Sequence, residues 1–176
     1  MSNSLTGRYV TFTGERMALE GHPLYVGDPA PDFTLIDGSL RSVSLRQMLG
    51  RVLLLATVPS LDTEVCSLET RRFDREVVKF GTQISYVTVS MDLPFAQRRW
   101  RSETSVEQVD ILSDYKERRF ATDYGLYIPD LGLLARAVLV LDKAGIVRYQ
   151  EIVPEVTDEP NYAAALEMAQ RLLSSD

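Results

Sequence analysis

The chain has 176 residues, 45% of them hydrophobic, and its 25 acidic and 19 basic side chains give a formal net charge of -6. This length and composition fit one domain over 1–176 with a sizeable core, and we expect about 1–7 to be disordered. The acidic balance argues against nucleic-acid binding, no apolar run is long enough to cross a membrane, and the lack of a signal peptide favours the cytoplasm.

Strand and helix patterns alternate in the first half of the chain. Alternating residues on both sides of Thr13-Gly14-Glu15 predict an N-terminal β-hairpin from 8–12 and 16–20. Further strands are predicted at 33–36, 41–43, 52–58 and 84–89, with a short helix after Ser44 and a longer helix at 67–80. The two apolar strands that flank the longer helix favour parallel neighbours with a right-handed crossover.

The second half continues the alternation. Asp92, with Pro94 just inside, marks the start of a helix that runs through Trp100. A strand is then predicted at 110–112, a helix at 115–122, a hairpin from 135–141 and 146–152, and a last helix opened by Thr157 or Asp158 that runs through 162–173. This order favours an α/β, thioredoxin-like fold in which helices flank a central mixed sheet.

The single cysteine, Cys66, follows the apolar strand and stands where the longer helix begins. A thiol at a helix N-terminus lies beside unpaired backbone N–H groups and the positive end of the helix dipole, which favour the thiolate. Thr63, three residues earlier, can direct its hydroxyl at the sulfur or cap the helix. Pro59 ends the strand and restricts the turn. These residues predict a partly buried, reactive thiol.

A purely structural role for Cys66 is the competing interpretation. Cysteine is among the most buried residue types, and Cys66 shares a helical stripe with Phe73, Val77 and Phe80. The other familiar cysteine chemistries lack their partners. The only histidine, His22, stands in a Gly-His-Pro turn, so the chain has neither an evident base for a cysteine protease nor a Cys/His cluster for zinc.

The spacing Pro59-x-x-x-Thr63-x-x-Cys66 resembles the active-site signature of the peroxiredoxins, and the whole run 58–66 resembles their thiol peroxidase branch. Other segments resemble that branch in the same order and spacing, namely 26–33, 89–97, 112–115, 134–138 and 155–166. The resemblance covers nearly all of the chain after its first residues. It implies a thioredoxin-like fold and a peroxidase that reduces hydrogen peroxide and alkyl or lipid hydroperoxides, without a cofactor or metal.

The resemblance also implies roles for the site residues. Cys66 would attack the peroxide as a thiolate and become a sulfenic acid. Thr63 would orient the peroxide and hold the thiolate, while Pro59 would shape the turn and shield the site. Arg136 stands in an apolar run where a charge needs a partner, and it matches the active-site arginine of the family. Taken alone, the residue pattern slightly favours a strand-end arginine that reaches solvent, and the match to the family arginine reverses this preference.

The sequence departs from the family pattern at one position. Thiol peroxidases of the atypical two-cysteine type carry a resolving cysteine where this chain has Arg101. The sulfenic acid must therefore be resolved by an external thiol, and thioredoxin, a glutaredoxin-like protein and a small thiol such as glutathione stay open. Arg101 itself is expected to be an exposed cation at a helix end, with steering of an anionic thiol as the alternative.

Two expectations concern partners and function. The family forms homodimers, and the apolar and aromatic set Leu93, Phe95, Trp100, Tyr127 and Ile128 is expected in the core or an interface, with part of it at the substrate mouth. The alternative to an enzyme is a non-catalytic peroxide sensor or holdase-like protein that has kept the fold. Thr63, Cys66 and Arg136 favour the enzyme.

Overall fold

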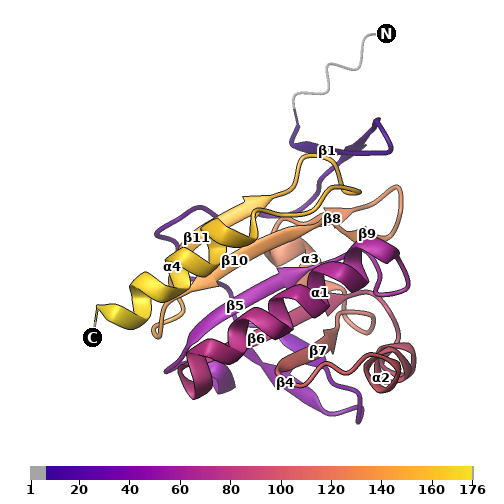
Figure 1. The fold of residues 1–176 in the computed structure, drawn as a ribbon. Helices are drawn as coiled ribbons and strands as arrows, with labels where there is room; N and C mark the ends of the chain where they lie inside the picture. Colours follow the sequence, from indigo (N-terminus) through magenta and orange to yellow (C-terminus); the bar gives the residue numbers. More distant parts are fainter. Residues whose placement is uncertain (1–6, 176) are drawn as a thin grey trace, which may run out of the picture.

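The computed structural model describes residues 7–175, so the expectation for 1–7 falls almost entirely outside the described residues. A mixed sheet of seven strands forms the centre, in the order β11-β10-β5-β6-β7-β3-β4 (Figure 1). Its strands are β3 (Thr34–Ile36), β4 (Ser42–Ser44), β5 (Val52–Thr57), β6 (Ile84–Ser90), β7 (Val109–Ser113), β10 (Ala137–Leu141) and β11 (Val147–Ile152). The α/β, thioredoxin-like prediction is confirmed, including the N-terminal hairpin of β1 (Tyr9–Phe12) and β2 (Glu15–Ala18).

Strands β5, β6 and β7 are parallel, whereas β10 runs antiparallel to β5. Every residue of β5 is buried, because helices or loops cover both faces of the sheet at this strand. A continuous apolar run is the pattern such a strand requires. The predicted parallel pair around the longer helix is therefore present.

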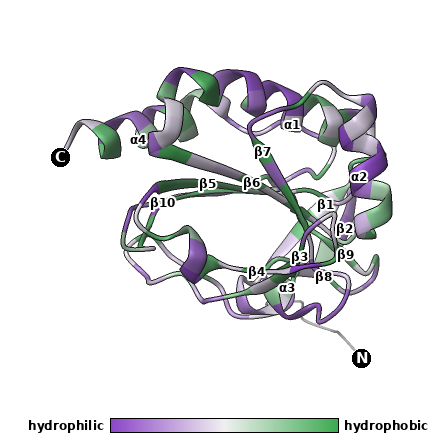
Figure 2. Cartoon of the chain, turned by 90° about the horizontal axis from the view of Figure 1, so that it is seen from below, coloured by the Kyte–Doolittle hydropathy of each residue, from purple (hydrophilic) through white to green (hydrophobic). Residues whose placement is uncertain are grey.

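Helices α1 (Glu64–Val77) and α4 (Tyr162–Ser174) cover one face of the sheet, and the short α3 (Arg119–Asp123) lies on the other (Figure 2). The first face holds a core cluster that includes Cys66, Phe73 and Tyr162. The second holds a cluster that includes Phe33 and Phe120. Helix α2 (Pro94–Glu103) packs beside β7. The other elements are a 3₁₀ turn η1 (Leu45–Met48), a 3₁₀ segment η2 (Val78–Gln83) that is kinked at Gly81, and a small β8–β9 pair (Tyr127–Ile128 and Leu133–Leu134).

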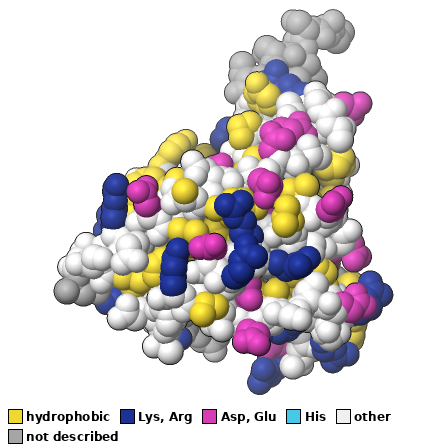
Figure 3. Space-filling model, in the orientation of Figure 1, with side chains coloured by type: hydrophobic (Ala, Val, Ile, Leu, Met, Phe, Trp, Pro, Cys, Tyr) yellow, Lys and Arg dark blue, Asp and Glu magenta, His cyan; other side chains and the backbone are white. Residues whose placement is uncertain are grey.

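The stripe predicted for the long helix is buried, since Cys66, Phe73, Val77 and Phe80 all face the core. The opposite face of α1 carries Arg71, Arg72 and Arg75, which are exposed, and Figure 3 shows basic side chains gathered on this side of the molecule. The helix is thus amphipathic, with its apolar face held against the sheet.

Several predicted boundaries were wrong. The long helix begins at Glu64 rather than at residue 67, so Cys66 lies inside its first turn. The helix predicted at 115–122 is only α3, because Arg118 adopts a left-handed conformation with φ of 56°. The last helix is capped by Asn161, not by Thr157 or Asp158. No helix among residues 7–175 is both long and apolar enough to span a bilayer.

Candidate active site

The register of two strands places Arg136 beside the loop that leads to Cys66. Ala137, the first residue of β10, pairs with Thr57, the last residue of β5. The hydroxyl of Thr57 also donates to the carbonyl of Ala135 at 2.8 Å. Arg136 lies between these two anchored residues, in the link from β9 to β10. The strand predicted at 135–141 begins at Ala137, so Arg136 lies one residue before it.

The loop from β5 to α1 is held by Asp92, which follows β6. Its carboxylate accepts hydrogen bonds from the Ser60 hydroxyl (2.7 Å) and the Leu61 N–H (2.8 Å), and from Ser90 at 2.7 Å. Asp92 therefore ties the loop to the neighbouring strand, while Leu93 takes the N-cap position of α2. Pro59 is buried at the start of the same loop, so it shapes the turn from inside the protein.

Thr63 caps α1. Its backbone is extended, and its hydroxyl oxygen accepts from the N–H of Cys66 at 3.4 Å. The same hydroxyl donates its hydrogen to the carbonyl of Ser60 at 3.0 Å. A hydroxyl has one hydrogen to donate, so in this geometry it cannot also donate to the sulfur. The hydroxyl therefore caps the helix in this structure, and the expectation that it also holds the thiolate stays a prediction.

The Cys66 sulfur is the end point of this arrangement. Arg136 Nη2 donates to Sγ at 3.2 Å, and Nε donates to the carbonyl of Val156 at 2.9 Å. The remaining nitrogen, Nη1, donates to the carboxylate of Glu69. A guanidinium offers donors in a fixed planar fork, so these three contacts set its orientation.

Cys66 and Glu69 have 0% exposed surface and Arg136 has 2%. The expectation of a partly exposed thiol was therefore wrong. Thr63 and Glu64, in the same turn of the chain as Cys66, are exposed. The buried Arg136 is paired with the buried Glu69, as a cation removed from water requires.

Burial shifts the pKa values of this buried pair. It raises the pKa of Glu69 to about 7, although Arg136 acts in the opposite direction. Burial also disfavours the charged form of Arg136, but Glu69 and Cys66 outweigh this effect and leave the pKa of Arg136 raised. Arg136 is therefore a permanent cation next to the sulfur.

The structure brings Thr63, Cys66 and Arg136 together, with Pro59 in the adjoining loop. Sequence reasoning missed Glu69 altogether. The available signal was its spacing, since a residue three positions after Cys66 falls on the same helix face. Sequence reasoning did single out Asp92, but as the start of α2 rather than as the anchor of the active-site loop.

Arg101 is half-buried, not a free cation at the end of α2. Its guanidinium donates to the carbonyls of Val109 and, at 3.2 Å, Glu107. It thereby links α2 to the loop before β7. Of the apolar set expected in the core or an interface, Trp100 and Ile128 are buried, whereas Leu93 and Phe95 are 51% and 57% exposed.

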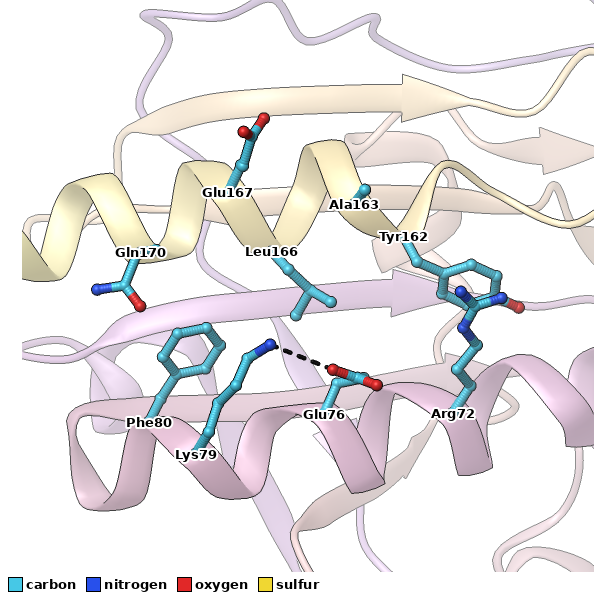
Figure 4. Close-up of a pocket in the computed structure, with 9 residues that line it drawn as sticks. All are labelled: Arg72, Glu76, Lys79, Phe80, Tyr162, Ala163, Leu166, Glu167 and Gln170. Carbon is cyan, nitrogen blue, oxygen red and sulfur yellow. Dashed lines mark hydrogen bonds and ion pairs between the residues drawn. The ribbon is translucent and has the colours of Figure 1, made fainter.

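A groove of about 400 Å³ lies between α1 and α4, and Cys66 is not among its lining residues (Figure 4). Its cationic side chains are engaged with neighbours: Arg72 lies 3.9 Å over the ring of Tyr162, and Lys79 pairs with Glu76 at 3.2 Å. This groove is therefore separate from the Cys66 site.

Known proteins that resemble this chain in sequence and those that resemble it in fold belong to the same group of proteins. The AhpC/TSA family model matches residues 26–150. A thiol peroxidase of Bacillus subtilis (strain 168) is 44% identical over 164 residues, which cover 93% of this chain and 98% of that protein. A thiol peroxidase of Streptococcus pneumoniae (strain ATCC BAA-255 / R6) is 44% identical over 163 residues, or 93% and 99% of the two chains. The crystal structure of a peroxiredoxin-like protein from Aquifex aeolicus has a TM-score of 0.86 at 38% identity, covering 94% and 98%.

Proposed function

The chain belongs to the AhpC/TSA family, and we propose that it carries out its thiol-dependent peroxidase reaction at Cys66, with Arg136 and Thr63 as further catalytic residues. It is a peroxiredoxin of the thiol peroxidase type. The observation that carries the assignment of the site is the 3.2 Å contact between Arg136 Nη2 and the Cys66 sulfur. A permanent cation at this distance stabilises negative charge on the sulfur in a site from which water is excluded.

The first step of the reaction uses the thiolate as the nucleophile. Cys66 Sγ attacks the terminal oxygen of R–O–O–H, an S–O bond forms and the O–O bond breaks. The leaving oxygen departs with the electron pair and takes up a proton to become R–OH. The sulfur is oxidised to the sulfenic acid, and the peroxide is reduced.

Three neighbours serve this step. The Arg136 fork faces the sulfur and supplies donors to the charge that develops on the oxygens. The Thr63 hydroxyl oxygen has a second lone pair beyond the one used by the Cys66 N–H, and it accepts the O–H of the incoming peroxide. Pro59 keeps the loop beneath the site closed to water.

The second step needs a thiol from another molecule, because the chain contains no second cysteine. The external thiolate attacks the sulfenic sulfur, an S–S bond forms and the S–O bond breaks, and the leaving hydroxide takes up a proton to become water, which leaves a mixed disulfide. A second thiol then releases Cys66 as a thiol and leaves as the oxidised disulfide. Since Cys66 is fully buried, the first turn of α1 has to open for this exchange.

The reductant belongs to the thiol class as a whole, with thioredoxin, a glutaredoxin-like protein and a small thiol as candidates. We place the protein in the cytoplasm, where such thiols are kept reduced. A homodimer would cover the exposed Leu93 and Phe95, the only two large apolar side chains of 93–103 that are more than half exposed. We treat 1–176 as a single domain.

Turnover tests this function. The protein is incubated with hydrogen peroxide or cumene hydroperoxide and a panel of thiols, and peroxide loss is followed over many equivalents. We expect repeated turnover with at least one thiol, and none after alkylation of the single cysteine or in Cys66→Ser. Consumption of one equivalent without recycling by any thiol would favour the peroxide sensor. Peroxide loss in Cys66→Ser would exclude the cysteine mechanism.

A further inference from the structure

Glu69 is a buried carboxyl group for which the reaction above has no use. It lies on α1 three residues after Cys66, so both side chains leave the same face of the helix. One carboxylate oxygen accepts from Arg136 Nη1, while Arg136 Nη2 contacts the Cys66 sulfur. Carboxylate and sulfur therefore occupy neighbouring positions around one guanidinium.

The other carboxylate oxygen, Oε1, is buried and has no hydrogen-bond partner among residues 7–175. A buried carboxylate with an unpartnered oxygen is costly, because desolvation is only partly compensated. Full ionisation of Glu69 and Cys66 together would also place two negative charges on one cation. Arg136 therefore stabilises one negative charge, on Glu69 or on Cys66, better than it stabilises both at once.

We propose that Glu69 is a positioning residue that competes with the Cys66 thiolate for Arg136, so that the two acidic groups share one proton. This inference rests on the proposed function of Cys66. In the reactive form, the proton is on the Glu69 carboxyl and the charge is on the sulfur. In the other form, the sulfur carries the proton and Glu69 is the carboxylate. The guanidinium stays in place in both forms, because Val156 and Glu69 hold its other nitrogens.

The groups that face Glu69 from the surrounding elements leave this sharing intact. Burial raises the pKa of Tyr86 on β6 and of Tyr162 on α4, so both phenols stay protonated near neutral pH. Burial raises the pKa of Glu69 itself to about 7, and the negative charges of Glu151 and Glu159 add to that effect. The charged and titratable groups around the carboxyl are Cys66 on α1, Tyr86 on β6, Arg136 before β10, Glu151 on β11, Glu159 before α4 and Tyr162 on α4.

The experiment is a titration of thiolate ultraviolet absorbance in the reduced protein and in Glu69→Gln. Glutamine keeps an acceptor for Arg136 and removes the competing charge. Two strongly coupled acids lose their protons in two macroscopic steps. We expect the wild-type thiolate to appear in two steps separated by at least about one pH unit, and in a single step in Glu69→Gln. Glu76→Gln, on the same helix but paired with Lys79 at the surface, should keep both steps. Superposable single-step curves for wild type and Glu69→Gln would overturn the proposal.

A second measurement does not depend on the folding of Glu69→Gln. The side-chain carboxyl carbon of Glu69 is followed by NMR in isotope-labelled wild-type protein and in Cys66→Ser. Coupling is reciprocal, so removal of the thiol should convert a two-step carboxyl titration into one step at lower pH. An unchanged titration would overturn the inference. Neither readout requires peroxide turnover, so failure of the proposed function and failure of this inference are distinguishable.

Discussion

Ala137 pairs with Thr57 across β10 and β5, and this register places the guanidinium of Arg136 on the sulfur of Cys66. The two side chains lie 70 residues apart in sequence. Cys66 follows β5 on α1, Arg136 directly precedes β10, and the two strands form an antiparallel ladder. A one-residue shift of that ladder would turn Arg136 to the opposite face of the sheet. The active site is therefore a consequence of strand register as much as of local sequence.

Replacement of Arg136 by methionine should lower the rate of peroxide reduction by on the order of 100- to 1000-fold, the usual effect of losing a preorganised donor. At pH 8, above the pKa of Glu69, it should also destabilise the protein by about 3 to 5 kcal/mol, because Glu69 would then be a buried carboxylate without a partner or would have to take up a proton. Stopped-flow kinetics measures the first effect and urea unfolding the second.

The double variant Arg136→Met with Glu69→Gln separates these effects. It removes both charges of the buried pair, so stability should return to near that of the wild type while the reaction stays slow. Recovery of the rate together with stability would mean that Arg136 acts only on the fold.

Replacement of Thr63 by valine should remove the cap of α1 and cost about 1 kcal/mol of stability. If the hydroxyl also accepts the O–H of the peroxide, the rate should fall by more than the loss of folded protein explains. Thr63→Ser keeps the hydroxyl and serves as the control, so its rate should stay close to that of the wild type. Equal rates for the valine and serine variants, measured under conditions where both are folded, would show that Thr63 only caps α1 and does not bind the peroxide.

Much of the fold could be predicted because local pattern and tertiary context agree. The run 52–57 is apolar throughout, as a strand covered on both faces must be, and Thr13-Gly14 marks the first hairpin. Residues 115–118 were predicted as helical, but Asp114 accepts from the N–H groups of Phe120 and Ala121 and starts α3 later. That contact spans a turn whose conformation the sequence pattern does not reveal.

The site could be predicted in part. Pro59, Thr63 and Cys66 lie close together in sequence, so a local motif was enough to group them. The contact of Arg136 with the sulfur depends on strand register, and only the family resemblance pointed to it. Glu69 was missed because a glutamate on a helix is usually exposed, and its burial depends on a cation that comes from another element.

Replacement of Asp92 by alanine should loosen the loop that carries Pro59 and Ser60. Its carboxylate holds Ser60 and Leu61 to the end of β6, and an anionic acceptor contributes about 1.5 to 3 kcal/mol per hydrogen bond. We expect lower stability and faster amide hydrogen exchange at the start of α1, measured by mass spectrometry. Asp62→Ala, which changes an exposed carboxylate of the same loop, is the matched control and should leave the exchange unchanged.

The stability of the protein should depend on pH through Glu69. Burial raises the pKa of this carboxyl from 4.5 to about 7 in the folded state, so the folded protein binds the proton more tightly than the unfolded chain. The stabilisation that protonated Glu69 contributes is fully present below pH 4.5 and is lost as the pH rises through about 7. For a shift of this size the loss in unfolding free energy is up to about 3 kcal/mol. Glu69→Gln cannot titrate and should lack this loss, so the difference in unfolding free energy between the two proteins should change with pH. Urea unfolding at pH 5 and pH 8 measures it, and Asp114, whose pKa burial also raises, cancels because both proteins contain it. A difference that is the same at both pH values would contradict a Glu69 that holds its proton in the folded state.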